Sequence, residues 1–542
     1  MKYKKAIIAG LYILLLLCCA GIVGVVGRLS GSRGWFFTEP AESGQTQEAL
    51  QGEEQLLQKR FIRDRLLQKQ IKREIERRLQ DRLQKKQREE QMRLARENAR
   101  LAREQAEKEH QAWLEAYRRW QWQNRMESEK PETEPEEPYR PPRLMIASDL
   151  HYMSQKTHDD GIAFQYMLSR DDGKISQYSD AAVDALLQEA VKEKPSALVL
   201  CGDNTLNGEW INHVELAKKL RQVQEAGVPV LIIPGNHDIQ NENAATYFDA
   251  NREKAEYLHS GQEFLDIFHE FGYDQAVSRD EASLSYVYAL DDRHWMMMLD
   301  SCQYEDYNHV NGRIRPETLD WMEQCLTEAK KRQITVVPAA HHNLLSESRL
   351  YTTECTLENH LEVVELLEAY ELPLYISGHL HAQRIKKHKS APGVPEDAYG
   401  ITEIVMSPYS IPPCQYGYLA WDEQDNMTFE TRKARLEDSL EEGDAGDAGL
   451  DAFTKNLIKK QVIQTIHSVP EDLKEEMADL YAELYYNYCA GNRMSWDLVR
   501  TTRAYKLWQR VAPDSKYVAE MGQMIEDVKE DLHDWGPEAE CN

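Results

Sequence analysis

Short apolar runs alternate with helical patterns through the middle of the chain. Six runs of strand length, each followed by turn or polar residues, read RLMIASD, SALVLCGD, VPVLIIPG, HWMMMLD, ITVVPAAHH and LPLYISGH. Amphipathic helical patterns lie between several of them, at 180–192, 213–225 and 317–331. Alternating strands and helices predict a layered α/β domain. Because the runs are apolar throughout, their strands are expected to be buried on both faces.

The pattern changes after about Leu436, where no further strand is predicted. Amphipathic helical patterns cover 450–467, 470–488, 498–511 and 516–533. Residues 436–542 are therefore expected to form a C-terminal helical region. It either packs on the α/β domain or forms a small separate unit.

The N-terminus carries a membrane-type pattern. Residues 1–5 contain three lysines, and residues 6–26 contain no charged side chain. A stretch of this length spans a bilayer and exceeds the apolar core of an ordinary secretory signal. We predict an uncleaved signal anchor at 6–26, a cytoplasmic tail at 1–5 and the bulk of the chain outside the cell membrane. A cleaved signal peptide is the alternative.

Residues 47–125 lack proline and are rich in Gln, Glu, Arg, Lys and Leu, which are good helix formers. Apolar residues recur four apart, at Leu67, Ile71, Ile75, Leu79 and Leu83. This spacing drifts around a helix, so it predicts a solvated stalk or an imperfect coiled coil. The composition of residues 47–125 is compatible with a charged spacer and with a segment that self-associates. The proline- and glutamate-rich stretch 127–143 then predicts an extended linker before an α/β domain at 144–435.

Length, charge and cysteine content limit the classes of protein to which the chain can belong. The 542 residues exceed what one hydrophobic core holds, so several folded units are expected. The net charge of −27 disfavours a nucleic-acid partner, because a polyanion would be repelled. The nine cysteines show no pairing of the C-x-x-C type, which argues against a disulfide framework or a zinc knuckle.

Candidate chemistry follows five of the six apolar runs. The residues at these strand ends are Asp149 and His151, Asp203 and Asn204, Asn236 to Asp238, His341 and His342, and His379 and His381. All of them are His, Asp or Asn, the donors that divalent metals take. In layered α/β folds ligands bind beyond the carboxyl ends of strands, so these residues are expected to converge. Any one of these motifs, taken alone, would more often be a set of ordinary turn residues.

The set D-x-H, G-D, G-N-H-D, a later His and G-H-x-H resembles the calcineurin-like metallophosphoesterase superfamily. The resemblance covers about residues 143–430. Longer strings such as SDLHY and PGNHDIQNENA look like a bacterial branch of exported or membrane-anchored enzymes with a helical C-terminal region. The resemblance implies a four-layer α/β/β/α sandwich with a dinuclear metal centre at the strand ends.

The resemblance also implies the ligands. One metal would be held by Asp149, His151, Asp203 and His381, and the other by Asp203, Asn236, His341 and His379. Asp203 would bridge the two ions. Of the adjacent pair, His341 is taken as the ligand because the family usually uses the first histidine.

The donor set suits two divalent ions of the Mn, Fe or Zn class. The resemblance implies a hydrolase in which a metal-bridging hydroxide attacks a small phosphomonoester or phosphodiester. His237 is expected to donate a proton or hydrogen bond to the leaving oxygen. Gly235 is expected to make the turn and Asp238 to orient a ligand from behind. His342 and Asn204 are candidates for supporting the ligands or contacting substrate.

Two questions stay open at this level. The segment 158–178 reads equally as a lid over the site and as an ordered surface loop. A stalked scaffold or adhesion protein with a vestigial phosphoesterase domain is the competing function. All seven expected ligand positions are filled, which a decayed enzyme need not preserve.

Overall fold

The computed structural model describes residues 139–345, 348–388, 400–436 and 449–536. These residues belong to one compact unit, Glu137–Asn542. The predicted anchor at 6–26, the stalk at 47–125 and most of the linker at 127–143 lie outside the described residues and stay predictions. Among the helices of the described part, none is both long and apolar enough to cross a bilayer.

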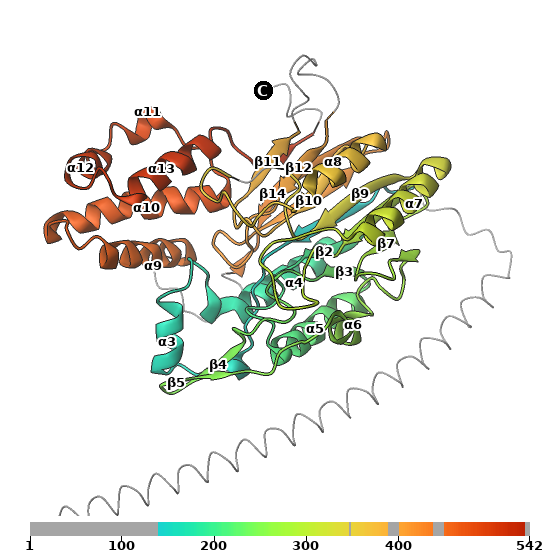
Figure 1. Cartoon of the computed structure of the whole chain (residues 1–542), viewed down its shortest axis with the longest axis horizontal. Coiled ribbons are helices and arrows are strands. Elements are labelled where there is room, and N and C mark those ends of the chain that lie inside the picture. The colour runs from blue at the N-terminus through green and yellow to red at the C-terminus, as the bar shows by residue number, and fades with distance from the viewer. Residues whose placement is uncertain (1–138, 346–347, 389–399, 437–448, 537–542) are drawn as a thin grey trace, which may run out of the picture. The chain divides into compact units, whose positions relative to one another are not determined.

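The first sheet has six strands in the order β15-β14-β13-β1-β2-β3. Of these strands, β2, β3 and β14 are labelled in Figure 1. They are β1 (Arg143–Ala147), β2 (Ala197–Cys201), β3 (Val230–Ile233), β13 (Gln415–Trp421), β14 (Met427–Lys433) and β15 (Asp534–Trp535). β1, β2 and β3 run parallel, and β13, β14 and β15 extend the sheet antiparallel to their neighbours. The parallel strands are the first three predicted runs, and all of their residues except Arg143 are buried.

The second sheet has seven strands in the order β11-β12-β10-β9-β8-β7-β6. They are β6 (Ser278–Arg279), β7 (Tyr286–Ala289), β8 (His294–Leu299), β9 (Thr335–Ala340), β10 (Leu374–Ser377), β11 (Arg384–Lys387) and β12 (Thr402–Val405). β8, β9, β10 and β12 are parallel, and the strands at both edges are antiparallel. A separate hairpin joins β4 (Ala245–Phe248) to β5 (Asn251–Lys254).

The two sheets share one core, and helices cover their outer faces. On β8, Met296 and Met298 point into the core shared with the first sheet. Met297 and Leu299 alternate with them and pack with the helices α7 (Pro316–Arg332) and α8 (His360–Ala369) on the other face. The helices α4 (Ser179–Glu193) and α5 (Trp210–Glu225) pack on the first sheet. The layers therefore run helices, sheet, sheet, helices, and the predicted mixed α/β fold is confirmed.

The helices of this part are α3 (Ile162–Leu168), α4 (Ser179–Glu193), α5 (Trp210–Glu225), α6 (Gly261–Phe268), α7 (Pro316–Arg332) and α8 (His360–Ala369). α4, α5 and α7 confirm the three helices predicted between the apolar runs. α7 shows why the helix begins and ends where it does. Proline stands in its first turn, three basic residues complement the helix dipole in its last, and Gln333 ends it in the left-handed conformation at φ 55°.

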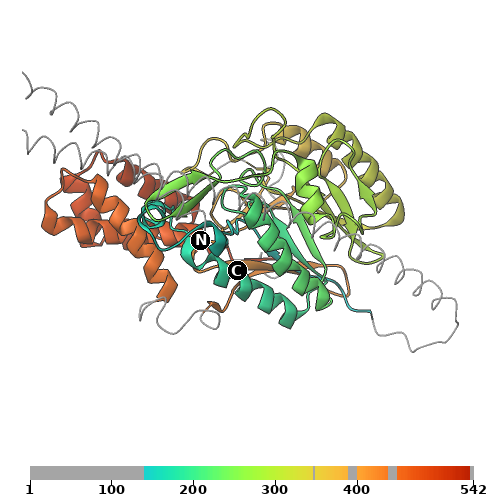
Figure 2. The same ribbon diagram turned by 90° about the horizontal axis from the view of Figure 1, so that it is seen from below.

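The C-terminal helices are α9 (Gly449–Thr465), α10 (Glu471–Ala490), α11 (Trp496–Val499), α12 (Arg503–Val511) and α13 (Lys516–Asp527). They form a cluster beside the sheets, visible in Figures 1 and 2. Their shared core centres on Trp508 and includes Leu380, Ala382 and Val405 of the α/β part. Of the two predicted alternatives, the helices therefore pack on the α/β domain.

Three expectations about this region are wrong. The single helix expected at 498–511 is broken, because Thr502 caps a new helix by accepting a hydrogen bond from the backbone N–H of Tyr505 at 3.2 Å. The helix expected at 516–533 ends at Asp527. No strand was expected after Leu436, yet the chain returns as β15 and pairs Trp535 with Phe429. A strand of two residues is too short to show a periodic pattern.

Candidate metal centre

Strand order brings the polar strand ends of both sheets to one edge. β1, β2 and β3 are parallel and in register, so the residues that follow them, Asp149, Asp203 and Asn236, emerge together. In the second sheet β9 and β10 are also parallel, and His341 and His379 follow their ends. Parallel strands present their carboxyl ends at a common edge, which is where ligands bind in α/β folds.

Hydrogen bonds join these loops within the second sheet and between the two sheets. Within the second sheet, the backbone N–H of Gly378 donates to the carbonyl of His341 at 2.9 Å. The backbone N–H of His379 lies 3.2 Å from both carboxylate oxygens of Asp149. The Nδ1 atom of His341 lies 2.9 Å from the carbonyl of Cys201. The loops are therefore fixed to each other by the chain itself.

The predicted ligands form two groups that share Asp203. The donor atoms within each group lie within 4.8 Å of one another. The first group is Asp149, His151, Asp203 and His381, and the second is Asp203, His341 and His379. Asn236 joins the second group, since its Oδ1 lies 3.1 Å from the Nε2 of His341. The structure thus brings together all seven residues that the family resemblance implied.

The donor set fits a divalent cation. Because Nδ1 of His341 donates to a carbonyl, Nε2 carries the lone pair in the neutral ring. That atom faces the Asp203 carboxylate at 3.3 Å and the Asn236 amide oxygen, which are also electron-pair donors. In the first group, the Nε2 atoms of His151 and His381 face each other at 3.0 Å. Such converging donors are stabilised by a cation placed among them.

The pKa values also indicate that a positive charge is stabilised beside the Asp203 carboxylate. Burial would raise the pKa of Asp203, but the imidazoles of His341 and His237 hold it well below its usual range. Burial opposes charge on His341, yet the carboxylate of Asp203 raises its pKa to about 9. Burial, aided by the charge of His341, lowers the pKa of His379 to about 4. A bound metal ion would balance the negative charge of Asp203 and replace the proton on His341, because imidazoles ligate metals in their neutral form.

Backbone strain is concentrated in the same residues. Five of the seven adopt left-handed conformations: Asp149 (φ 55°), His151 (φ 42°), Asp203 (φ 49°), His379 (φ 64°) and His381 (φ 55°). This region costs a non-glycine residue on the order of 1–3 kcal/mol and persists only where the surroundings impose it. The chain therefore gives up stability to aim these side chains at one another.

Two glycines allow the loops to approach closely. A Cβ atom on Gly235 would lie 2.1 Å from the backbone nitrogen of Asp203, and one on Gly378 would lie 1.9 Å from Oγ of Ser148. Gly235 does open the expected turn, accepting a hydrogen bond from the N–H of Asp238 at 3.1 Å. The need for glycine there comes from the contact with Asp203.

Asp238 and Asn204 connect the loops behind the metal ligands. Both are fully buried. The Asp238 carboxylate accepts hydrogen bonds from the backbone N–H groups of Gly235 (2.8 Å), Asn204 (3.1 Å) and Thr205 (2.9 Å) and from the Asn204 amide (2.9 Å). Asp238 thus supports the two loops rather than one ligand. Of the two roles considered for Asn204, the structure favours support.

His237 lies beside the groups and reaches solvent. Its side chain is 31% exposed, and its Nε2 lies 4.0 Å from the Asp203 carboxylate. Nδ1 lies 2.7 Å from the carbonyl of Leu206, to which it donates, and the backbone N–H donates to Asp203 at 2.7 Å. These contacts turn Nε2 toward the site. An exposed imidazole in this position is available to a substrate.

His342 is held away from solvent. Its Nδ1 lies 2.8 Å from the Ser301 hydroxyl and its Nε2 lies 2.9 Å from the carbonyl of Val310. Its ring contacts those of His341 and His379, at centroid distances of 5.1 Å and 4.5 Å. Of the two roles considered for His342, the structure favours support of the ligands.

One contact at the site could not be predicted from the sequence, and one open question about a nearby segment is answered by the structure. The Asn308 amide donates to the carbonyls of Asn236 (2.5 Å) and Ile239 (2.7 Å), so a remote loop holds the GNHD turn. A lone asparagine in a polar loop gives no sequence signal of this kind. The segment 158–178, considered as a lid or a surface loop, folds partly as α3 and packs on the β4–β5 hairpin. It also carries the buried Lys174.

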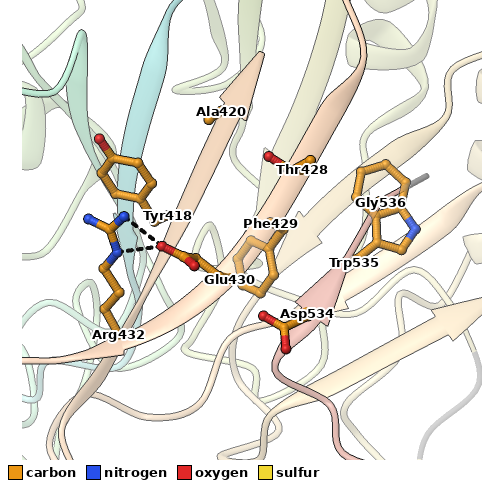
Figure 3. Close-up of a pocket in the computed structure, with 9 residues that line it drawn as sticks. All are labelled: Tyr418, Ala420, Thr428, Phe429, Glu430, Arg432, Asp534, Trp535 and Gly536. Atoms are coloured by element: carbon orange, nitrogen blue, oxygen red, sulfur yellow. Dashed lines mark hydrogen bonds and ion pairs between the residues drawn. The ribbon is translucent and has the colours of Figure 1, made fainter. Parts of the chain in front are cut away.

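A pocket of about 350 Å³ lies elsewhere, on strands β13, β14 and β15. Figure 3 shows that Arg432 and Glu430 face each other there, with nitrogen–oxygen distances of 2.6 Å and 2.5 Å. The Arg432 guanidinium also lies 3.7 Å from the centre of the Tyr418 ring. The lining contains none of the predicted site residues, and its arginine is already paired.

The part of the chain that carries the predicted site residues is similar to known proteins. Residues 142–383 match the family model described as calcineurin-like phosphoesterase. A curated protein of Psychrobacter arcticus, described as a probable cyclic nucleotide phosphodiesterase, is 24% identical over 220 residues, which are 40% of this chain and 67% of that protein.

Two solved structures illustrate the similarity. A dimetal phosphatase from Danio rerio gives a TM-score of 0.41 at 15% identity, covering 54% of this chain and 97% of that chain. A protein from Thermus thermophilus gives a TM-score of 0.30 at 11% identity, covering 54% of this chain and 100% of that chain.

Proposed function

Because residues 142–383 belong to the calcineurin-like phosphoesterase family, we propose that this metal-dependent phosphoesterase hydrolyses a small phosphomonoester or phosphodiester with two divalent metal ions. The observation that carries the proposal is the convergence of two donor groups on the shared carboxylate of Asp203. Ions of the Mn, Fe or Zn class suit these carboxylate, amide and imidazole donors.

The site residues have two proposed roles, metal ligation and proton donation. Asp149, His151 and His381 would hold one ion, Asn236, His341 and His379 the other, and Asp203 both. When bound, such ions polarise a phosphoryl oxygen and activate water. His237 stands outside both groups with Nε2 toward the site, so we assign it the proton or hydrogen bond to the leaving oxygen.

Purified protein is expected to hydrolyse p-nitrophenyl phosphate or bis(p-nitrophenyl) phosphate only with added divalent metal, and a chelator should stop the reaction. Comparing the two substrates separates a monoesterase from a diesterase. Elemental analysis of the same sample should find about two ions per chain. A folded chain that holds no metal and hydrolyses neither substrate would favour the vestigial scaffold instead.

We further propose that the enzyme is displayed outside the cell membrane, with residues 6–26 as a signal anchor, 1–5 in the cytoplasm and 47–125 as a stalk. The support is the uncharged stretch and the lysines before it. Self-association through the stalk stays open. Alkaline carbonate washing should leave the full chain in the membrane pellet. Release of the intact chain into the wash would contradict the anchor.

A further inference from the structure

Glu209 is a buried acidic residue to which the proposed mechanism gives no role. It is 1% exposed and lies immediately before α5, in the loop that follows β2 and also carries Asp203. A glutamate is seldom buried unless other groups satisfy its carboxylate. The partners of this carboxylate therefore show what Glu209 holds in place.

The carboxylate accepts three N–H hydrogen bonds. One oxygen accepts from the backbone N–H of Asn207 at 2.9 Å and from the side-chain amide of Asn212 at 2.8 Å. The other oxygen accepts from the backbone N–H of Ala245 at 3.2 Å. Glu209 thus joins the loop after β2 to helix α5 and to the first residue of β4.

The peptide group between Leu206 and Asn207 connects Glu209 to His237. Its N–H is the Asn207 donor to the Glu209 carboxylate. Its C=O is the Leu206 carbonyl, which accepts a hydrogen bond from Nδ1 of His237 at 2.7 Å. Because a peptide group is planar, fixing the direction of its N–H also fixes the direction of its C=O. A single peptide group therefore separates the Glu209 carboxylate from the imidazole.

The Leu206 carbonyl restrains the orientation of His237. The side chain of His237 is 31% exposed, so packing restrains its ring less than it would restrain a buried one. The hydrogen bond at Nδ1 leaves Nε2 directed toward the site, 4.0 Å from the Asp203 carboxylate. Hydrogen bonds in series strengthen one another, so a carboxylate at the N–H makes the C=O of the same peptide a better acceptor.

We propose that Glu209 is a positioning residue for His237. Its carboxylate fixes the Leu206–Asn207 peptide, and the carbonyl of that peptide keeps Nε2 of the imidazole turned toward the leaving oxygen of the substrate. This inference rests on the proposed function, in which His237 is the proton donor. Glu209 belongs to neither donor group of the candidate metal centre, so its effect on the reaction passes through His237.

The test measures kcat, KM and metal content of the full chain, with the class of phosphate ester that the wild type hydrolyses. Glu209→Leu fills a similar volume but accepts no hydrogen bond, so the peptide loses its restraint. We expect kcat to fall about a hundredfold, as a small misplacement of a catalytic group can cause. KM and metal content should stay close to the wild-type values, because every metal ligand is kept. The loss should be larger for an alkyl ester than for a p-nitrophenyl ester, whose phenolate leaves without a proton.

A double-mutant cycle with His237→Gln separates positioning from a general structural role. Glu209 also holds α5 and β4, and a purely structural role would lower kcat by the same factor with or without His237. In the His237→Gln background, we expect Glu209→Leu to lower kcat by no more than about twofold, because the residue through which it acts is already absent.

Three further variants complete the test. Glu209→Gln keeps an oxygen that can accept from Asn207, so it should retain most of kcat. Glu270→Leu is the matched control, since Glu270 is also a buried glutamate, 9% exposed and 2.5 Å from Arg221; its kcat should not change. Should Glu209→Leu not fold, Glu209→Asp keeps the charge but shortens the side chain by one carbon. It should then show the same loss of kcat and the same result in the cycle.

The outcomes distinguish this inference from the proposed function. If the wild type hydrolyses its ester and a folded Glu209→Leu or Glu209→Asp variant keeps the wild-type kcat, the inference alone is overturned. An equal loss with and without His237 would also overturn it and leave Glu209 with a structural role. A wild type that holds no metal and hydrolyses no ester would instead contradict the proposed function, and the inference with it.

Discussion

Replacement of Asp203 by asparagine is expected to lower metal-dependent hydrolysis by about a thousandfold or more, as loss of a major electrostatic contribution does. Asp203 is the residue common to both donor groups. Asparagine keeps the size of the side chain and an oxygen that can accept from the N–H of His237, now 2.7 Å from the carboxylate. The variant therefore removes the shared negative charge while sparing the turn. Kinetics with p-nitrophenyl phosphate measure the loss of activity, and elemental analysis of the same sample measures the loss of bound metal.

Metal content decides how this result is interpreted. If Asp203 bridges two ions, Asp203→Asn should hold about one ion or none, while the wild type holds about two. Asp320→Asn, on the exposed side of α7, is the matched control and should change neither quantity. A variant with full metal content and full activity would mean that Asp203 is not a ligand.

The sequence predicted the parts of the fold that depend on local pattern. All six apolar runs became strands, and helices formed between them, because burial on both faces demands uninterrupted apolar segments. The direction of parallel strands then explains why His and Asp residues distant in sequence converge, and the family resemblance assigned the metal ligands among them, including Asp149 and Asp203. The strand and helix predictions use only information within one short segment, whereas the ligand assignment needed all five motifs together.

Features made by long-range contact were not predictable. Asp149 and Asp203 adopt left-handed conformations. Aspartate enters this region more often than most residues, but only where its surroundings impose it, so the residue type alone does not predict it. Lys174 looked like an ordinary lysine in a polar insert, yet it is buried. The residue before it, Gly173, accepts a hydrogen bond from the Thr454 hydroxyl of α9, about 280 residues away. β15 forms because the chain returns to β14 after the last helix.

Replacement of His237 by glutamine is expected to lower kcat by roughly 10²–10⁴-fold, the range for loss of a general acid, with metal content unchanged. His237 lies outside both donor groups, and its Nδ1 is occupied by the Leu206 carbonyl at 2.7 Å. Its exposed Nε2 is thus the ring atom available to a substrate. The measurement is kcat for phosphate esters whose leaving groups differ in pKa. His259→Gln, at an exposed position, is the control.

The dependence on the leaving group distinguishes proton donation from other roles of His237. A p-nitrophenolate ion leaves without a proton, so the variant should lose least with that ester and most with an alkyl ester. A plot of log kcat against leaving-group pKa should therefore be steeper for the variant than for the wild type. An equal loss with every ester would assign His237 to phosphate binding, and a loss of metal would make it a ligand. A steeper plot with intact metal content leaves proton donation as the role, because neither binding nor ligation depends on how much charge the departing oxygen can bear.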